Sequence, residues 1–307
     1  MASTPISVIS KGSWVIGLIR TMRPKQWTKN IIIYAGIVFD GQLLVWDSLM
    51  RVTLGFVLLC LGAGAVYIIN DLLDIERDRQ HPKKKSRPLA SGQLPIPVAI
   101  AAAIVLPVTS LLIAVLYSPR FAAILAFYIG LHVLYSFWLK HIVLLDLLAI
   151  TAGYVLRVAG GVMVIEVDRF SPWLYTCTAL LALFLAIGKR RQELLMLGEN
   201  ADQLRPIFKD YNLPLLDELL RIVTTSTLLA YILYTIEAPS ILLAGNNLAL
   251  ITVPFVLYAL MRYLYLIHVK GEGSAPDEVV LQDRPLLLAI LLWGVSFVII
   301  LYLPRAL

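Results

Sequence analysis

Four oxygen-bearing side chains follow one another where a long apolar stretch meets polar sequence, in the run Asn70-Asp71-Leu-Leu-Asp74-Ile-Glu-Arg-Asp78. At 3.6 residues per helical turn, these four side chains fall within an arc of roughly 100° on one face of a helix. Crowded carboxylates repel one another unless cations lie between them. Mg²⁺ fits such a site, because it prefers a few carboxylates together with phosphate oxygens and water, and the negative end of a helix dipole favours a cation.

We therefore predict a Mg²⁺ and diphosphate site at a water-exposed helix end. Its metal ligands are Asn70, Asp71, Asp74 and Asp78, and its catalytic residues are the three aspartates. The alternative is that the acids only solvate the helix end and pair with neighbouring cations. We favour the binding site, because acidic side chains at membrane depth are costly and usually functional.

Several cations lie downstream of the acids and could neutralise a phosphate group. Arg87 is the best of these candidates, because a positively charged loop at the membrane surface explains the run from Lys83 to Lys85 equally well. Arg77 lies within the acidic run and Arg79 directly follows it, and both could pair with its carboxylates.

The elements that must position these side chains are membrane-spanning helices. The chain has 307 residues, of which 59% are hydrophobic and 15% charged, whereas a soluble domain carries about 25% charged residues. At roughly 20 apolar residues per crossing, we predict an all-α membrane protein, a bundle of about nine transmembrane helices in one domain over residues 1–307. The predicted helices are 30–46, 49–71, 95–117, 119–138, 142–164, 172–196, 216–236, 247–268 and 284–303.

Positive charge differs between the two sets of loops. If the N-terminus lies inside, the loops on its side hold most of the Lys and Arg, whereas the opposite side holds Arg51, Arg120 and Arg169, with Arg305 at the tail. Since loops rich in Lys and Arg stay cytoplasmic, we predict a plasma-membrane protein whose active site and longer cap loops face the cytoplasm. The segments 79–92 and 197–212 should lie on that side, and 238–246 on the other.

The same charge pattern bears on partners and processing. The net charge of +6 suits membrane lipids with anionic headgroups or phosphorylated substrates. We expect no nucleic-acid partner, because the sequence has no soluble basic domain that could bind one. The first 29 residues lack the apolar core and cleavage site of a secretory signal. Cys60 and Cys177 both fall in apolar spans, so no disulfide framework is expected. The sequence leaves a homo-oligomer open.

The motif Asn70-Asp71-x-x-Asp74-x-x-x-Asp78, followed by Arg87-Pro-Leu-Ala-Ser-Gly, resembles the UbiA prenyltransferase superfamily. The helix count and the charge distribution extend the resemblance over nearly the whole chain. In that family the first Asp-rich motif binds Mg²⁺ and a substrate diphosphate, inside a helical bundle with a lateral opening for a polyprenyl chain. The resemblance implies the same role for these acids.

Further candidate substrate-binding residues follow from the resemblance and from spacing. The stretch from Tyr135 to Lys140 is similar to the family's Tyr-Ser-x-x-Leu-Lys, whose lysine faces the cavity; the alternative for Lys140 is an interfacial anchor. Asp146 and Arg157 are 11 residues apart, close to three turns, so they share a helix face. Both should point inward rather than at lipid. Asn70 and Arg87 complete this part of the set.

The chain departs from the family at the second motif. Aromatic prenyltransferases carry a second Asp-x-x-x-Asp run after the sixth helix, whereas this chain has Gly188-Lys189-Arg190-Arg191-Gln-Glu193. Two extra positive charges suit a donor with more phosphate groups. Together with Arg23-Pro-Lys25-Gln26-Trp27, the pattern most resembles the polyprenyl-phosphate (decaprenyl-phosphate) phosphoribosyltransferases of the superfamily. This adds Lys25, Lys189, Arg190 and Glu193 to the predicted substrate-binding residues, although a Trp/Lys interfacial belt also explains Lys25.

This resemblance implies an enzyme, a pentosyl-type glycosyltransferase. With Mg²⁺ it would transfer the 5-phosphoribosyl group of 5-phosphoribosyl 1-diphosphate to polyprenyl phosphate, and so form a lipid-linked phosphoribose for cell-wall arabinan precursors. Lys189, Arg190 and Lys25 would hold the 5-phosphate. Two alternatives stay open: a prenyltransferase that alkylates an aromatic or quinone precursor, and an ion-coupled transporter. Charges clustered at one face rather than at the midplane argue against the transporter.

Overall fold

The computed structural model describes residues 13–80, 84–165, 171–198, 206–237, 247–272 and 276–306. Helices dominate these ranges, and no β-strand occurs within them. The prediction of an all-α protein is therefore confirmed. The segment 238–246 and parts of 79–92 and 197–212, for which a side of the membrane was predicted, lie outside the described residues.

Eight of the described helical segments are long and apolar enough to cross a membrane, so the chain is a multi-pass membrane protein. They correspond to eight of the nine predicted spans, with ends that shift by a few residues. These segments are α3 (Trp46–Leu73), α5 (Ile96–Tyr117), α6 (Pro119–Phe137), α7 (Leu145–Ile165), α8 (Pro172–Leu197), α10 (Leu213–Ile236), α11 (Val253–Tyr265) with its flanking turns η7 (Leu248–Thr252) and η8 (Leu266–Lys270), and α13 (Arg284–Ala306).

The first predicted span, 30–46, is not a long α-helix. The chain instead forms a 3₁₀ helix, η1 (Pro24–Tyr34), which continues into the short α2 (Ala35–Phe39). A 3₁₀ helix rises about 2.0 Å per residue and an α-helix about 1.5 Å, so η1 and α2 together extend roughly 30 Å, about the thickness of the hydrocarbon core. The sequence-based prediction of about 20 residues per membrane crossing assumes α-helical rise throughout. A segment that is mostly 3₁₀ helix covers the same length with fewer residues, which explains why no long α-helix forms here.

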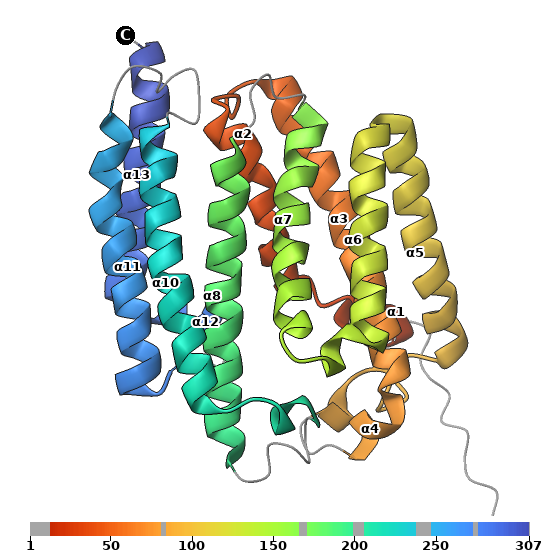
Figure 1. Cartoon of the computed structure of the whole chain (residues 1–307). Coiled ribbons are helices and arrows are strands. Elements are labelled where there is room, and N and C mark those ends of the chain that lie inside the picture. The colour runs from red at the N-terminus through yellow and green to blue at the C-terminus, as the bar shows by residue number, and fades with distance from the viewer. Residues whose placement is uncertain are drawn as a thin grey trace, which may run out of the picture.

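Apart from α2, which lies at the opposite end (Figure 1), most of the short elements lie toward the end of the bundle where α3 finishes, which we call the site end; the opposite end is the far end. Figure 1 shows α4 (Ile75–Gln80) below α3, and the C-terminus at the far end. The other short elements are α1 (Ser13–Thr21), η2 (Lys84–Ser86), η3 (Leu139–His141), η5 (Pro206–Lys209) and α12 (Pro276–Gln282). That the site end faces the cytoplasm stays a prediction.

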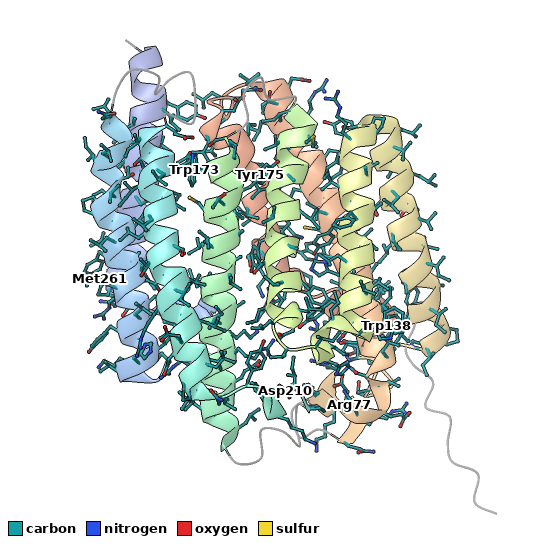
Figure 2. The ribbon with its side chains drawn as sticks, in the orientation of Figure 1. Arg77, Trp138, Trp173, Tyr175, Asp210 and Met261 are labelled. Carbon is teal, nitrogen blue, oxygen red and sulfur yellow. The ribbon has the colours of Figure 1, made fainter. Side chains whose placement is uncertain are left out.

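Aromatic side chains occur near both ends of the bundle. Trp138 lies toward the site end, whereas Trp173 and Tyr175 lie toward the far end (Figure 2). Between them the outer surface is apolar, as at the exposed Leu112 of α5 and Met261 of α11. This arrangement is typical of a bundle that meets lipid around its middle and headgroups at both ends.

The most buried spans are α3 and α7, and they carry the acidic site residues Asp71 and Asp146. One core cluster joins these helices with η1 and α6, and a second joins α8, α10 and α11. Close backbone contact fixes η1 against α7: a Cβ atom at Gly161 would lie only 1.9 Å from the carbonyl oxygen of Ile33. Small residues allow such close packing between membrane helices.

Candidate active site

The acidic motif forms a buried ion-pair cluster at the site end. Asp71, on the last turn of α3, is 2% exposed, and its Oδ1 accepts hydrogen bonds from Arg23 Nη2 at 2.5 Å and Arg87 Nη1 at 3.2 Å. The same Arg87 nitrogen donates to Asp78 Oδ2 at 2.6 Å. One guanidinium therefore joins two of the predicted metal ligands. The expectation that the acids lie at a water-exposed helix end is wrong for Asp71 and Asp78, because both are buried.

Asp74 has a different environment. It is the C-cap residue of α3, after which the chain turns and resumes as α4. Its carboxylate lies 3.7 Å from Lys140 Nζ and 3.6 Å from Arg77 Nη1. The structure thus brings Lys140, in η3, to the acidic motif, where the sequence had also allowed an interfacial anchor. Asn70 is half-buried one residue before Asp71.

Arg23 is a site residue that the sequence analysis missed. Besides its bond to Asp71, its guanidinium lies over the ring of Tyr67, 4.7 Å from the centroid. Its backbone is left-handed, with φ 54° and ψ 63°, a conformation uncommon for residues other than glycine and enriched at functional sites. Pro24 signalled only that right-handed helix is disfavoured at Arg23; it did not predict the left-handed backbone or the contact with Asp71. The neighbouring Lys25, which the sequence favoured, is exposed at the start of η1.

A second charged cluster lies where α7, α8 and the segment after η5 meet. Asp146 is fully buried; its Oδ2 pairs with Arg190 Nη2 at 2.8 Å, and its Oδ1 accepts a hydrogen bond from the Tyr211 hydroxyl at 2.7 Å. Arg190 also donates to Glu193 at 2.6 Å. Burial and the bond to Asp146 raise the pKa of the Tyr211 phenol above its ordinary value. Tyr135, on α6, interacts electrostatically with Arg190.

The two cations of the predicted second motif do not lie together. Arg190 is buried at 4% exposure and held between two carboxylates, whereas Lys189 is exposed. Adjacent residues of an α-helix point about 100° apart, so the two side chains leave α8 in different directions. Arg191 points elsewhere again and pairs with Asp217 of α10 at 2.6 Å.

Arg157 lies deep in the bundle and faces inward, as predicted. Its guanidinium donates to Asn30 Oδ1 at 2.7 Å, to the Tyr128 hydroxyl at 2.8 Å and to the Gly153 carbonyl at 2.8 Å. These contacts join η1, α6 and α7. The structure therefore places Arg157 in a packing role between helices and not in either acidic cluster, and its contact with substrate stays a prediction.

The oxygen atoms that the acidic motif could offer a metal ion suit Mg²⁺. The amide of Asn70 and the carboxylates of Asp71, Asp74 and Asp78 are hard oxygen donors at the negative end of a helix. Among the described residues, no group of three or more His, Cys, Asp or Glu side chains is already arranged around a metal-sized space. Arg87 lies between two of the acids instead, so a metal must displace part of this ion pairing.

The architecture and the acidic motif point to one family of membrane enzymes. The model of the UbiA prenyltransferase family matches residues 31–277. The chain belongs to the UbiA prenyltransferase family. Within it, the chain is 31% identical to the decaprenyl-phosphate phosphoribosyltransferase of Corynebacterium glutamicum over 292 residues, which cover 94% of this chain and 87% of the relative. It is 31% identical to the enzyme of the same name from Mycobacterium tuberculosis, over 91% of this chain and 92% of the relative.

Solved UbiA structures have the same fold. A UbiA homologue from Archaeoglobus fulgidus, solved bound to GPP and Mg²⁺, superimposes with a TM-score of 0.68 and 16% identity, over 93% of this chain and 96% of that one. At this identity the likeness concerns the fold alone. From its family and its relatives, this UbiA-family chain is a transferase enzyme.

Proposed function

We propose that this UbiA-family chain, as one membrane domain over residues 1–307, transfers a 5-phosphoribosyl group from 5-phosphoribosyl 1-diphosphate to polyprenyl (decaprenyl) phosphate. The observation that carries the proposal is the density of cations around the acids: Arg23, Arg87 and Lys140 each lie within 3.7 Å of a motif carboxylate. Its similarity to relatives named decaprenyl-phosphate phosphoribosyltransferase supports the same choice. The product would serve cell-wall arabinan synthesis.

The site residues have separate tasks in this reaction. Bound Mg²⁺ would supply positive charge that makes diphosphate a better leaving group. Asp71 and Asp78 would hold the ion, and Arg23 and Arg87, no longer paired with these carboxylates, would bind the diphosphate oxygens, for which guanidinium forks are well suited. A phosphate oxygen of the lipid then bonds to ribose C1, and the bond from C1 to the diphosphate breaks. Because the lipid phosphate is already anionic at neutral pH, positioning and charge stabilisation suffice without a strong base.

The experiment that tests this function is direct. The purified chain, incubated with Mg²⁺, labelled 5-phosphoribosyl 1-diphosphate and polyprenyl phosphate, should form a labelled lipid and release diphosphate. A parallel reaction supplies polyprenyl diphosphate and an aromatic acceptor. Product in the second reaction alone would replace our proposal with the aromatic prenyltransferase alternative.

The donor's 5-phosphate would contact Lys189 and Arg190, with Lys25 as a further candidate. Losing one charge-assisted contact costs about 1.5–3 kcal/mol, so Lys189→Ala should raise the Michaelis constant for the donor roughly ten-fold to a hundred-fold. The constant for polyprenyl phosphate should change little, because the tail contributes most of its binding. Metal dependence should persist.

Arg191→Ala is the matched control, since Arg191 is adjacent on α8 but pairs with Asp217. It should leave the donor constant unchanged. Arg190→Ala needs a parallel measurement of thermal stability, because it leaves the fully buried Asp146 without its cation, a strongly destabilising change. Unchanged donor constants in both Lys189→Ala and a folded Arg190→Ala would remove the second motif from the donor site.

We further propose that the enzyme resides in the plasma membrane with its site end in the cytoplasm, as the loop charges favour. Ser91 is exposed between η2 and α5 at the site end, and Arg120 is exposed at the far end, where α6 begins. In intact cells, an impermeant thiol reagent should label Arg120→Cys and spare Ser91→Cys until the cells are permeabilised. Labelling of Ser91→Cys from outside would invert the topology.

A further inference from the structure

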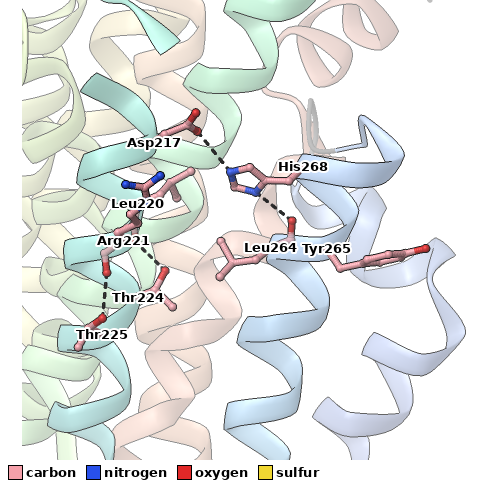
Figure 3. A pocket seen from close by; sticks show the side chains of 8 residues that line it. All are labelled: Asp217, Leu220, Arg221, Thr224, Thr225, Leu264, Tyr265 and His268. Atoms are coloured by element: carbon pink, nitrogen blue, oxygen red, sulfur yellow. Dashed lines mark hydrogen bonds and ion pairs between the residues drawn. The ribbon is translucent and has the colours of Figure 1, made fainter. Parts of the chain in front are cut away.

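A groove of about 570 Å³ lies between α10 and α11, apart from the acidic motif. The wall from α10 includes Asp217, Arg221 and Thr224, and the wall from α11 and η8 includes Leu264, Tyr265 and His268 (Figure 3). The charged side chains lie together at one end of the groove (Figure 3). Asp217 is in the second turn of α10 and His268 is in the last turn of its span, so this is the site end.

The charged end of the groove is surrounded by more basic than acidic side chains. Asp217 Oδ1 accepts from Arg191 Nε at 2.6 Å and lies 3.3 Å from His268 Nε2, while His268 Nδ1 lies 3.0 Å from the Leu264 carbonyl oxygen. Both partners of the imidazole are acceptors, and a neutral imidazole can donate to only one of them. Three basic side chains, Arg191, Arg221 and His268, therefore lie around two acidic ones, Asp217 and Glu218.

Arg221 is free to reach a ligand. Its side chain is 78% exposed, and its contact with Glu218, at 3.2 Å, is a pair on the helix surface. Such exposed pairs contribute little and exchange readily. On the other wall, η8 is a turn of π-helix, a local irregularity that is frequent at functional sites, and it carries His268 into the groove.

The surroundings of the groove are apolar and belong to the lipid-facing surface. Leu264 and the ring of Tyr265 line it, and Ile222, Leu229 and Met261 are exposed on the flanking helices. A ligand here therefore meets the basic side chains Arg221 and His268 at the level of the headgroups and apolar side chains toward the middle of the bilayer. This combination suits a molecule with a phosphate at one end and acyl chains at the other.

We propose that the α10–α11 groove binds an anionic glycerophospholipid from the leaflet that surrounds the site end. The lipid phosphate lies between Arg221 and His268, and an acyl chain packs along Leu264 and Tyr265. Basic pockets between membrane helices bind anionic headgroups in this way. The groove is a lipid site on the outer surface of the bundle, and its binding is independent of the transfer reaction proposed above.

The test uses the full-length purified chain in neutral detergent, with phosphatidylglycerol as the probe and phosphatidylcholine as the zwitterionic comparison, measured by native mass spectrometry. Phosphatidylglycerol should bind with the higher affinity. A cation near headgroups contributes about 1 kcal/mol, so Arg221→Gln should weaken binding about five-fold and the Arg221→Gln/His268→Gln pair about twenty-five-fold. Arg51→Gln is the matched control, because Arg51 also pairs with an acid on its own helix but lies at the far end; it should leave binding unchanged.

Three outcomes would overturn the proposal. Equal affinity for the two lipids would make the groove an unselective part of the lipid-facing surface. Unchanged phosphatidylglycerol binding in the double variant would place the lipid elsewhere. Displacement of the lipid by an equal concentration of inorganic phosphate or of polyprenyl phosphate would make the groove a site for a soluble anion or for the substrate.

Discussion

Asp71→Asn is expected to lower turnover at least about a thousand-fold while the bundle stays folded. Asparagine keeps the shape of Asp71 and an oxygen that can accept from Arg23 and Arg87, so the packing persists. It removes a negative charge that would hold Mg²⁺, the ion that would compensate the charge of the donor diphosphate, and loss of one preorganised electrostatic contact at a reacting centre costs about a hundred- to a thousand-fold. Losing a charged metal ligand should therefore lower turnover at least about a thousand-fold. Asp74→Ala and excess chelator should likewise abolish product.

The measurement is formation of the labelled lipid at saturating substrates, alongside the thermal unfolding temperature in detergent. Asp47→Asn is the matched control: Asp47 lies at the opposite end of the same helix, is 76% exposed and pairs with Arg51. This variant should keep full activity. A folded Asp71→Asn enzyme that retains more than a tenth of wild-type turnover would contradict the metal-site proposal, as would full activity in chelator.

Gly161→Ala should destabilise the bundle by about 3 kcal/mol or more, although its side chain is far from the acidic motif. A Cβ at this position meets the backbone oxygen of Ile33 at 1.9 Å, and backbone cannot rotate away as a flexible side chain can. Overpacking a tight core costs about 1–3 kcal/mol and occasionally more. Relief requires η1 to move off α7. That shift would also disturb Arg157, which bonds to Asn30 of η1.

Unfolding in mixed micelles of neutral and denaturing detergent measures the free energy of unfolding, which is compared between the Gly161→Ala variant and the wild-type chain. The matched substitution is Gly130→Ala on α6, where no described atom lies within 4 Å of the added Cβ. It should be neutral, or stabilising by up to about 1 kcal/mol, because alanine favours helix. Because η1 also positions Arg23 at Asp71, Gly161→Ala should lower activity as well. Equal stability of the two variants would show that η1 is not held by this contact.

Much of the fold could be predicted because its causes are local in sequence. A bilayer leaves no backbone polar group unpaired, so apolar runs of about 20 residues must form helices, and eight of the nine predicted runs do so. The acidic motif could also be recognised, because residues three or four apart on a helix share a face. The prediction of one continuous helix face was wrong, because a turn at Asp74 places Asp71 on α3 and Asp78 on α4; Arg87 bridges the two acids instead. The UbiA family followed from the same residues.

The tertiary structure alone decided which partners these residues have. Arg23 bonds to Asp71 across 48 positions of sequence, and Tyr211 to Asp146 across 65. Spacing along one helix carries no information about such contacts, which depend on how η1 and the segment after η5 pack against the bundle. The same packing buries Asp71, fixes Arg190 between two carboxylates and leaves Lys189 exposed. The sequence by itself therefore determined the helices and the position of the acids along the chain. Packing between distant segments decided which charges are paired and buried and which remain available to a substrate.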